Sequence, residues 1–152
     1  MIEIGLDDLS DGKVISLLEL HRYEMFKHSP PQSVHALDVE AMHHPDLSFY
    51  SARLDGRFVA CGALKKHDAN LTEIKSMKTK DQFLRLGIAN AMLIFLIDNA
   101  RKCGCSKVCL ETGTVDAFIP ARQMYTRAGF VKCEPFSGYV RDPHSVCMAL
   151  AL

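Results

Sequence analysis

Apolar and polar residues alternate along the first half of the chain in the manner of β-strands. Residues 1–5 read as a short strand, and longer strands are predicted over Leu47–Leu54, Arg57–Lys65 and Leu71–Thr79. Asp55-Gly56 separates two of them as a two-residue hairpin turn, a position that favours residues able to adopt positive φ. This half of the chain therefore predicts an antiparallel sheet.

Apolar residues at helical spacing predict helices around and after these strands, with turn-forming or capping residues at their ends. The predicted helices run from Ser10 or Asp11 to about Lys27, from Ser33 to Met42, from about Leu86 to near Gly104, and from Val115 to Ala128. The remaining strands are predicted over Lys107–Thr112, Phe130–Cys133 and Ser145–Ala151.

The order of these elements predicts the fold class. A strand–helix–strand unit normally forms a parallel pair with a right-handed crossover, and here it follows an antiparallel half. We therefore expect an α+β fold, a mixed and mostly antiparallel sheet of about seven strands flanked by helices on both faces. At 152 residues the chain is expected to form a single domain, residues 1–152.

Composition narrows the function classes. Lys and Arg number 18 and Asp and Glu number 18, so charge gives no reason to expect a nucleic-acid or membrane-surface partner. The first residues lack the features of a signal peptide, no apolar run is long enough for a membrane span, and a cytoplasmic location is expected. The six cysteines lack zinc-ligand spacing, so buried thiols and no metal are expected.

The stretch from Gln82 to Ala89 is the most informative part of the chain, because it joins a polar strand to an apolar helix through Gly87. The first turn of a helix has unpaired N–H groups and a positive partial charge, which together bind anions. The sequence contains neither a P-loop nor a Gly-x-Gly-x-x-Gly dinucleotide motif. The pattern predicts a phosphate site of a different type.

Four segments together resemble the GNAT superfamily of N-acetyltransferases, and the chain's ending resembles a bacterial branch labelled YsnE-like. The resemblance covers residues 47–152 well and the first 46 by topology. It implies the acyl-CoA N-acyltransferase fold and acetyl-CoA as the acyl donor. The segments that carry it are Glu73–Thr79, Leu84–Ala89, Leu110–Gly113 and Ala121–Phe130, followed by Pro135–Tyr139 and Ser145–Met148.

The resemblance also implies where the donor binds. The pantetheine arm would pair with the strand like an added strand, and backbone N–H groups of the helix start would hold the pyrophosphate. Two positions depart from the family pattern: Leu84 stands where Arg or Gln is usual, and Phe118 where many relatives have Asn. The implied cofactor-binding residues are Met77, Lys78, Thr79, Arg85, Leu86, Gly87, Ile88, Ala89, Asn90 and Tyr125.

Acetyl transfer to an amine needs a neutral amine, a stabilised oxyanion and a proton for the leaving thiolate. By its place in the motif, Tyr125 is the expected acid, and a backbone N–H near Met77 or Thr79 is the expected oxyanion contact. Glu73 is the expected base, with Glu111 as a rival. Either carboxylate could instead form an ion pair that holds the site in place, with Lys75 or Arg122 as its partner.

The acceptor is expected to be a small-molecule primary amine that attacks acetyl-CoA directly in a ternary complex. Its pocket is expected to be built from Lys27–Gln32 and Tyr139–His144, and His21 could line it. Acetylation of a protein or peptide amine, and a non-catalytic acyl-CoA-binding regulatory module, remain alternatives. The resemblance further implies a homodimer formed through the C-terminal strands.

Overall fold

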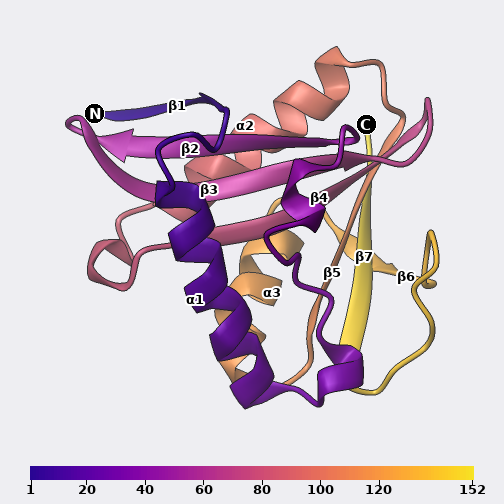
Figure 1. Cartoon of the computed structure of the whole chain (residues 1–152). Coiled ribbons are helices and arrows are strands. Elements are labelled where there is room, and N and C mark those ends of the chain that lie inside the picture. The colour runs from indigo at the N-terminus through magenta and orange to yellow at the C-terminus, as the bar shows by residue number, and fades with distance from the viewer.

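The computed structural model describes residues 1–152 as a single mixed sheet with helices on both faces (Figure 1). The seven strands lie in the order β1-β2-β3-β4-β5-β7-β6, and only β4 and β5 pair in parallel. The predicted fold class is therefore confirmed. The strands are β1 (Ile2–Asp7), β2 (Leu47–Leu54), β3 (Arg57–Lys66), β4 (Leu71–Thr79), β5 (Lys107–Gly113), β6 (Val131–Cys133) and β7 (Ser145–Ala151).

Three α-helices and four short 3-10 turns complete the chain. None of the helices combines the length and the apolar character needed to cross a lipid bilayer. The helices are α1 (Lys13–His28), α2 (Ile88–Lys102) and α3 (Ile119–Arg127), and the turns are η1 (Pro31–Ser33), η2 (Ala41–His43), η3 (Asp81–Phe83) and η4 (Asp116–Phe118).

Two apolar layers hold the helices against the sheet. The apolar stripe of α2, which includes Leu93 and Leu96, packs with Tyr125 of α3 on one face. The apolar stripe of α1, which includes Val14 and Leu17, packs on the opposite face. Both stripes follow helical periodicity, so burying them fixes which side of the sheet each helix covers.

The sheet opens between β4 and β5. The two strands pair at only three positions, of which Glu73 with Cys109 is the last. Beyond this pair the strands separate, although β4 continues to Thr79 and β5 to Gly113. The separation leaves the β5-facing edge of β4 available for another hydrogen-bonding partner.

A β-bulge bends β4 in its second half. The register with β3 shifts between the pairs Ala63 with Lys75 and Cys61 with Lys78, so one residue of β3 faces two of β4. Ser76 within this bulge has φ of 57°, in the left-handed region that non-glycine residues rarely occupy. The bulge redirects the backbone around Met77.

Several predicted elements differ from those observed. The stretch 33–42 is not a helix, since only η1 and η2 lie near its ends, and Asp38 instead accepts a hydrogen bond from the Ala41 N–H at 2.8 Å. The N-cap position of the first helix is Gly12, with φ of 75°, and not Ser10 or Asp11, although the Asp11 carboxylate accepts a hydrogen bond from the Lys13 N–H at 3.0 Å. The predicted helix 115–128 divides into η4 and α3, because Pro120 favours a first helical turn and not a helix interior.

Candidate active site

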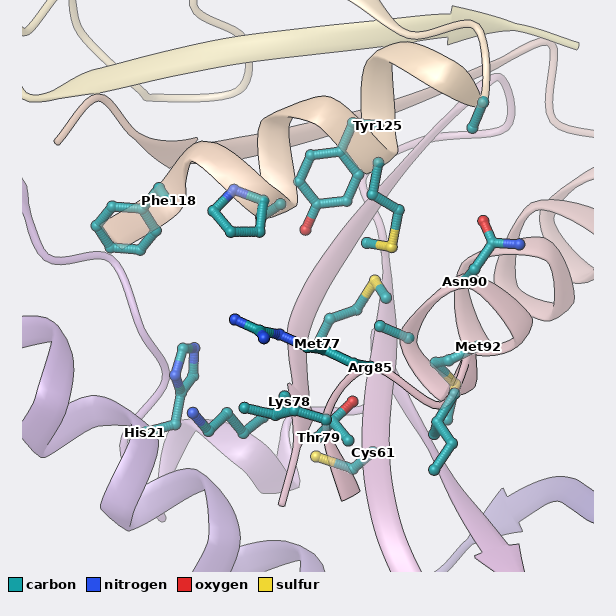
Figure 2. Close-up of a pocket in the computed structure, with 18 of the residues that line it drawn as sticks. His21, Cys61, Met77, Lys78, Thr79, Arg85, Asn90, Met92, Phe118 and Tyr125 are labelled. Carbon is teal, nitrogen blue, oxygen red and sulfur yellow. The ribbon is translucent and has the colours of Figure 1, made fainter. Parts of the chain in front are cut away.

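A large cavity lies at the opening between β4 and β5, with α1 on one side and α2 and α3 on the other (Figure 2). We call it the main cavity, and its volume is about 1110 Å³. All but one of the predicted cofactor-binding residues line it, Leu86 being the exception. These lining residues are Met77, Lys78, Thr79, Arg85, Gly87, Ile88, Ala89, Asn90 and Tyr125.

The start of α2 forms a cluster of free N–H groups on the wall of the main cavity. The first backbone hydrogen bond of the helix is donated by Ala91 to the carbonyl of Gly87 at 3.0 Å, so the N–H groups of Gly87 to Asn90 have no protein acceptor. Arg85 and Gly87 both have positive φ, 63° and 80°, which turns the backbone into a concave loop. This geometry is typical of anion sites.

Two arginines add positive charge to the main cavity. The side chain of Arg85 extends into it, as Figure 2 shows, and Arg127 lines it from the end of α3. Neither guanidinium forms an ion pair with a carboxylate of the protein. Leu84, at the position where a polar side chain was expected, also lines the cavity and is 51% exposed. Arg85 and Arg127 therefore supply charge that Leu84 cannot.

Lys78 has a different role from these arginines. Its ammonium group lies 3.1 Å from Glu24 of α1 and 3.7 Å from Asp81 of η3. Because the side-chain charge is already paired, what Lys78 can offer a ligand is its backbone. The ion pair also joins α1 to β4 along one wall of the main cavity.

Tyr125 reaches the cavity from α3. The residue is only 8% exposed, and Figure 2 shows its hydroxyl pointing into the cavity. Burial, followed by the nearby charge of Glu111, raises the pKa of Tyr125 to about 12. The hydroxyl therefore keeps its proton at neutral and moderately alkaline pH, and it is available to donate to a group that gains negative charge.

A second, smaller space adjoins the main cavity on the α1 face of the sheet. We call it the side pocket; its volume is about 70 Å³. His21 and Met25 of α1 line both spaces, so the two meet at these side chains. Burial and the positive charge of Lys78 lower the pKa of His21 to about 4, which leaves the imidazole neutral at pH 7. The predicted base Glu73 and its rival Glu111 both line the side pocket.

Glu73 is 2% exposed, and both oxygens of its carboxylate accept hydrogen bonds. His67 lies 2.9 Å from one oxygen, while Tyr139 donates to the other at 2.6 Å and Lys75 at 3.3 Å. Lys75 also donates to the Tyr139 hydroxyl at 2.8 Å. The ion pair between Glu73 and Lys75, one of the two predicted alternatives, is thus present.

Glu111 has a sparser environment. Its one hydrogen bond comes from the Ser145 hydroxyl at 2.9 Å, and burial raises the pKa of its carboxyl group above the usual range. Arg122 does not pair with it; the guanidinium donates instead to the carbonyls of Gly113 and Val115 at 2.8 and 3.3 Å. The predicted Arg122 ion pair is therefore absent.

The chain segments around the side pocket differ in part from those predicted. Tyr139 lines it as expected, but the other contributing loop is His35–Leu37 rather than Lys27–Gln32. Ser33 and Asp142 hydrogen-bond to each other and hold the two loops together. The contacts of Tyr139 with Glu73 and Lys75 were not predicted, since they join residues more than 60 positions apart.

Phe118 closes the end of the main cavity and packs directly on Gly113. A Cβ atom at Gly113 would lie 2.3 Å from the Phe118 ring. We expect Gly113→Ala to lower the free energy of unfolding by about 1–3 kcal/mol, the usual cost of overpacking. Urea denaturation measures this change. Gly5→Ala is the control, because its Cβ would meet nothing within 4 Å; equal midpoints for the two variants would contradict the packing.

The comparisons with known proteins agree with this geometry. The family model described as "Acetyltransferase (GNAT) family" matches residues 14–130. The uncharacterised N-acetyltransferase YsnE of Bacillus subtilis strain 168 is 42% identical over 151 residues, covering 99% of this chain and all of the relative. A protein named IAA acetyltransferase from Azospirillum brasilense is 34% identical over 143 residues, covering 92% of this chain and 90% of the relative.

A solved structure supports the fold. The crystal structure of a GNAT family acetyltransferase from Elizabethkingia anophelis, with acetyl-CoA bound, superposes with a TM-score of 0.73. The two sequences are 17% identical, and the match covers 99% of this chain and 98% of the other.

Proposed function

This chain belongs to the acetyltransferase (GNAT) family and is an acetyl-CoA-dependent N-acetyltransferase, and from this premise we propose that it acetylates a primary amine of a small molecule by direct attack in a ternary complex. The observation that carries the proposal is a single continuous space. The free N–H groups of α2, the open edge of β4 and the Tyr125 hydroxyl all border the main cavity.

The donor's binding mode follows from these groups. The N–H groups from Arg85 to Asn90 would hold the pyrophosphate of acetyl-CoA, with the Arg85 and Arg127 side chains nearby. The pantetheine arm would lie along β4 at Met77 to Thr79, where β5 has separated from it. Leu86 would contribute its N–H, although its side chain does not line the main cavity and is 57% exposed.

Two side-chain functions complete the proposed reaction. The Tyr125 hydroxyl would donate to the sulfur as the thiolate leaves. A carboxylate on the side pocket, Glu73 or Glu111, would receive the proton that the ammonium must lose before it can attack. A backbone N–H at the β4 bulge, near Met77 or Thr79, would contact the oxyanion.

The proposed class of acceptor rests on the size of the side pocket and on the relatives. A pocket of about 70 Å³ admits the end of a small amine. The name IAA acetyltransferase, carried by the Azospirillum brasilense relative, supports a small-molecule acceptor. A protein or peptide amine is the second candidate, because a lysine side chain also ends in a primary amine on an unbranched CH₂.

The test is release of free thiol from acetyl-CoA with a panel of acceptors. The panel comprises ethanolamine, putrescine, tyramine and Nα-acetyl-lysine amide, whose free ε-amine stands for a protein amine. We expect release that depends on a small amine. Release only with the lysine derivative would favour the protein acceptor. Tight CoA binding without turnover on any acceptor would favour a non-catalytic CoA-binding module.

We also infer a homodimer formed through the C-terminal strands, and a reducing, cytoplasmic location. β6 is an edge strand whose Val131 is 65% exposed, which supports an interface there. Cys133 and Cys147 lie directly opposite each other on β6 and β7, and in a reducing compartment they would remain thiols. Light scattering of the purified chain tests the dimer.

A further inference from the structure

The two carboxylates of the side pocket share one face of the sheet but have different environments. Glu73 pairs with Cys109 across β4 and β5, and Glu111 lies two residues beyond Cys109, so strand alternation brings both side chains to the same face. Glu73 is neutralised by Lys75 and also receives hydrogen bonds from Tyr139 and His67. Glu111 has no cationic partner within ion-pair distance.

This difference divides the roles of the two residues. A carboxylate with three donors has little capacity left for a ligand, because each oxygen already accepts strong hydrogen bonds. Glu111 accepts one bond, from the Ser145 hydroxyl, lines the side pocket and has lone pairs free for a ligand. Glu73 is therefore suited to hold Tyr139 and Lys75 in place, and Glu111 is suited to meet a cation.

We propose that the acceptor enters the side pocket as a primary ammonium ion, that Glu111 binds this ammonium, and that Glu111 is the base that removes its proton. The inference rests on the proposed acetyl transfer and adds the site and the charge class of the acceptor to it. Glu73 becomes a positioning residue, which holds Tyr139 at the pocket wall without taking part in proton transfer.

The proposed reaction begins with the ammonium form of the acceptor. An N–H bond of the ammonium breaks and its proton passes to a Glu111 oxygen, leaving a lone pair on nitrogen. That lone pair forms the C–N bond with the thioester carbon, and the C–S bond then breaks to release the thiolate of CoA. The Tyr125 hydroxyl gives its proton to the sulfur, the second proton lost by nitrogen restores that hydroxyl, and Glu111 returns its proton to water, so that one proton is released overall.

The dimensions of the side pocket limit the acceptor further. About 70 Å³ has room for only a few heavy atoms. The rings of Tyr139 and His35 form one side of the side pocket. They pack edge to face, with their centroids 4.9 Å apart. An ammonium on an unbranched CH₂ fits such a space, while a methyl group on the neighbouring carbon would have to displace one of these rings.

The electrostatics of Glu111 agree with a functional role. Burial raises the pKa of its carboxyl group, so the ionised form costs folding stability at neutral pH, and a costly buried carboxylate is typical of functional sites. The hydrogen bond from Ser145 lowers the pKa of the same carboxyl group. Charged and titratable groups face Glu111 from five parts of the fold. They are Glu73 and Lys75 of β4, His35 of the loop between η1 and η2, Tyr125 of α3, Tyr139 of the loop between β6 and β7, and Cys147 of β7.

The experiment is the pH dependence of kcat/KM in Glu111→Gln, with ethanolamine, putrescine and tyramine as the amines. We expect at least a tenfold loss at pH 7. The loss should shrink as the pH approaches the amine pKa of about 10, because a neutral amine needs no base. The urea midpoint should stay the same or rise, since the variant removes a buried charge. Glu134→Gln, an exposed glutamate outside both spaces, is the matched control.

Two further variants keep the test decisive. Ser145→Ala should move the acidic limb of the profile to higher pH, because it removes the hydrogen bond that favours ionised Glu111. Glu73→Gln should lower the free energy of unfolding. The activity that this variant retains should still show the acidic limb in its pH profile. A tenfold preference for tyramine over α-methyltyramine is expected from the pocket size.

The outcomes separate the two levels of the proposal. Three results would overturn the role of Glu111 while leaving the acetyl transfer intact. The first is a loss of kcat/KM in Glu111→Gln that is the same at every pH, and the second is no loss at all. The third is an acidic limb that disappears in Glu73→Gln and not in Glu111→Gln. Absence of amine-dependent thiol release by the unmodified protein would overturn both.

Discussion

Glutamate in place of Gly87 is expected to abolish binding of CoA. Gly87 has φ of 80°, and a Cβ atom there would meet nothing within 4 Å, so the new side chain has room beside the free N–H groups of α2. It would occupy the space proposed for the pyrophosphate with a like charge. Two such charges about 4 Å apart cost about 4 kcal/mol at an effective dielectric constant of ~20, or roughly a thousandfold in Kd. Calorimetry with CoA measures this change.

The control for this variant is Gly104→Glu. Gly104 has a similar φ of 83° and open space around its Cβ position, but it lies beyond the opposite end of α2 and outside the main cavity. It carries the same backbone strain and the same added charge, so CoA affinity should be unchanged in it. Equal affinity in the two variants would show that the start of α2 is not the phosphate site.

Phenylalanine in place of Tyr125 is expected to lower kcat by roughly 100-fold, within the usual range for the loss of a general acid. The KM for acetyl-CoA should change little, because the hydroxyl acts on the charge that develops as the thiolate leaves. Single-turnover thiol release at saturating acetyl-CoA measures the chemical step directly. Tyr23→Phe is the control, since that tyrosine is 61% exposed on α1 and lines neither space.

The pH profile provides a second test of Tyr125. Burial raises its pKa to about 12, so the hydroxyl loses its proton only as the pH approaches that value. As the pH rises to 10, deprotonation of Tyr125 should therefore cause no fall in activity. An alkaline limb near pH 9 that disappears in Tyr125→Phe would mean that the phenol ionises far more readily than its buried position allows.

The helix start with its free N–H groups was predictable from the sequence because its constraints are local. Gly87 lies at the start of a helix, and the helix supplies the N–H groups wherever the rest of the chain goes. The hairpin at Asp55-Gly56 was predictable for the same reason, and both residues have the expected positive φ, 50° and 83°. Short-range patterns of this kind report backbone geometry directly.

The side pocket was not predictable, because it is built by contacts between distant parts of the chain. Nothing near Glu73 in the sequence indicates that Tyr139 will donate to it from 66 residues away. The stretch 33–42 contains residues compatible with a helix, but His35–Leu37 line the side pocket and Ser33 is tied to Asp142. Tertiary contacts there outweigh local helix propensity.

The structure also changes the interpretation of Tyr125. Sequence alone suggests an ordinary phenol with a pKa near ~10. Burial against α2 and the sheet raises that pKa to about 12, which makes Tyr125 a weaker acid than a free phenol. A strong hydrogen bond to the departing thiolate suits this residue better than complete early transfer of its proton.

The separation of β4 from β5 has a consequence for the lifetime of the protein. Four strands lie on one side of this opening and three on the other, and the strands bordering it pair at only three positions. A donor lying along β4 would fill the opening. Binding of the donor and the free energy of unfolding would therefore be thermodynamically coupled. Ligand at 100 times its Kd would add about 2.7 kcal/mol to the free energy of unfolding. The supply of acyl donor in the cell would then control how much enzyme survives proteolysis as well as how fast it turns over.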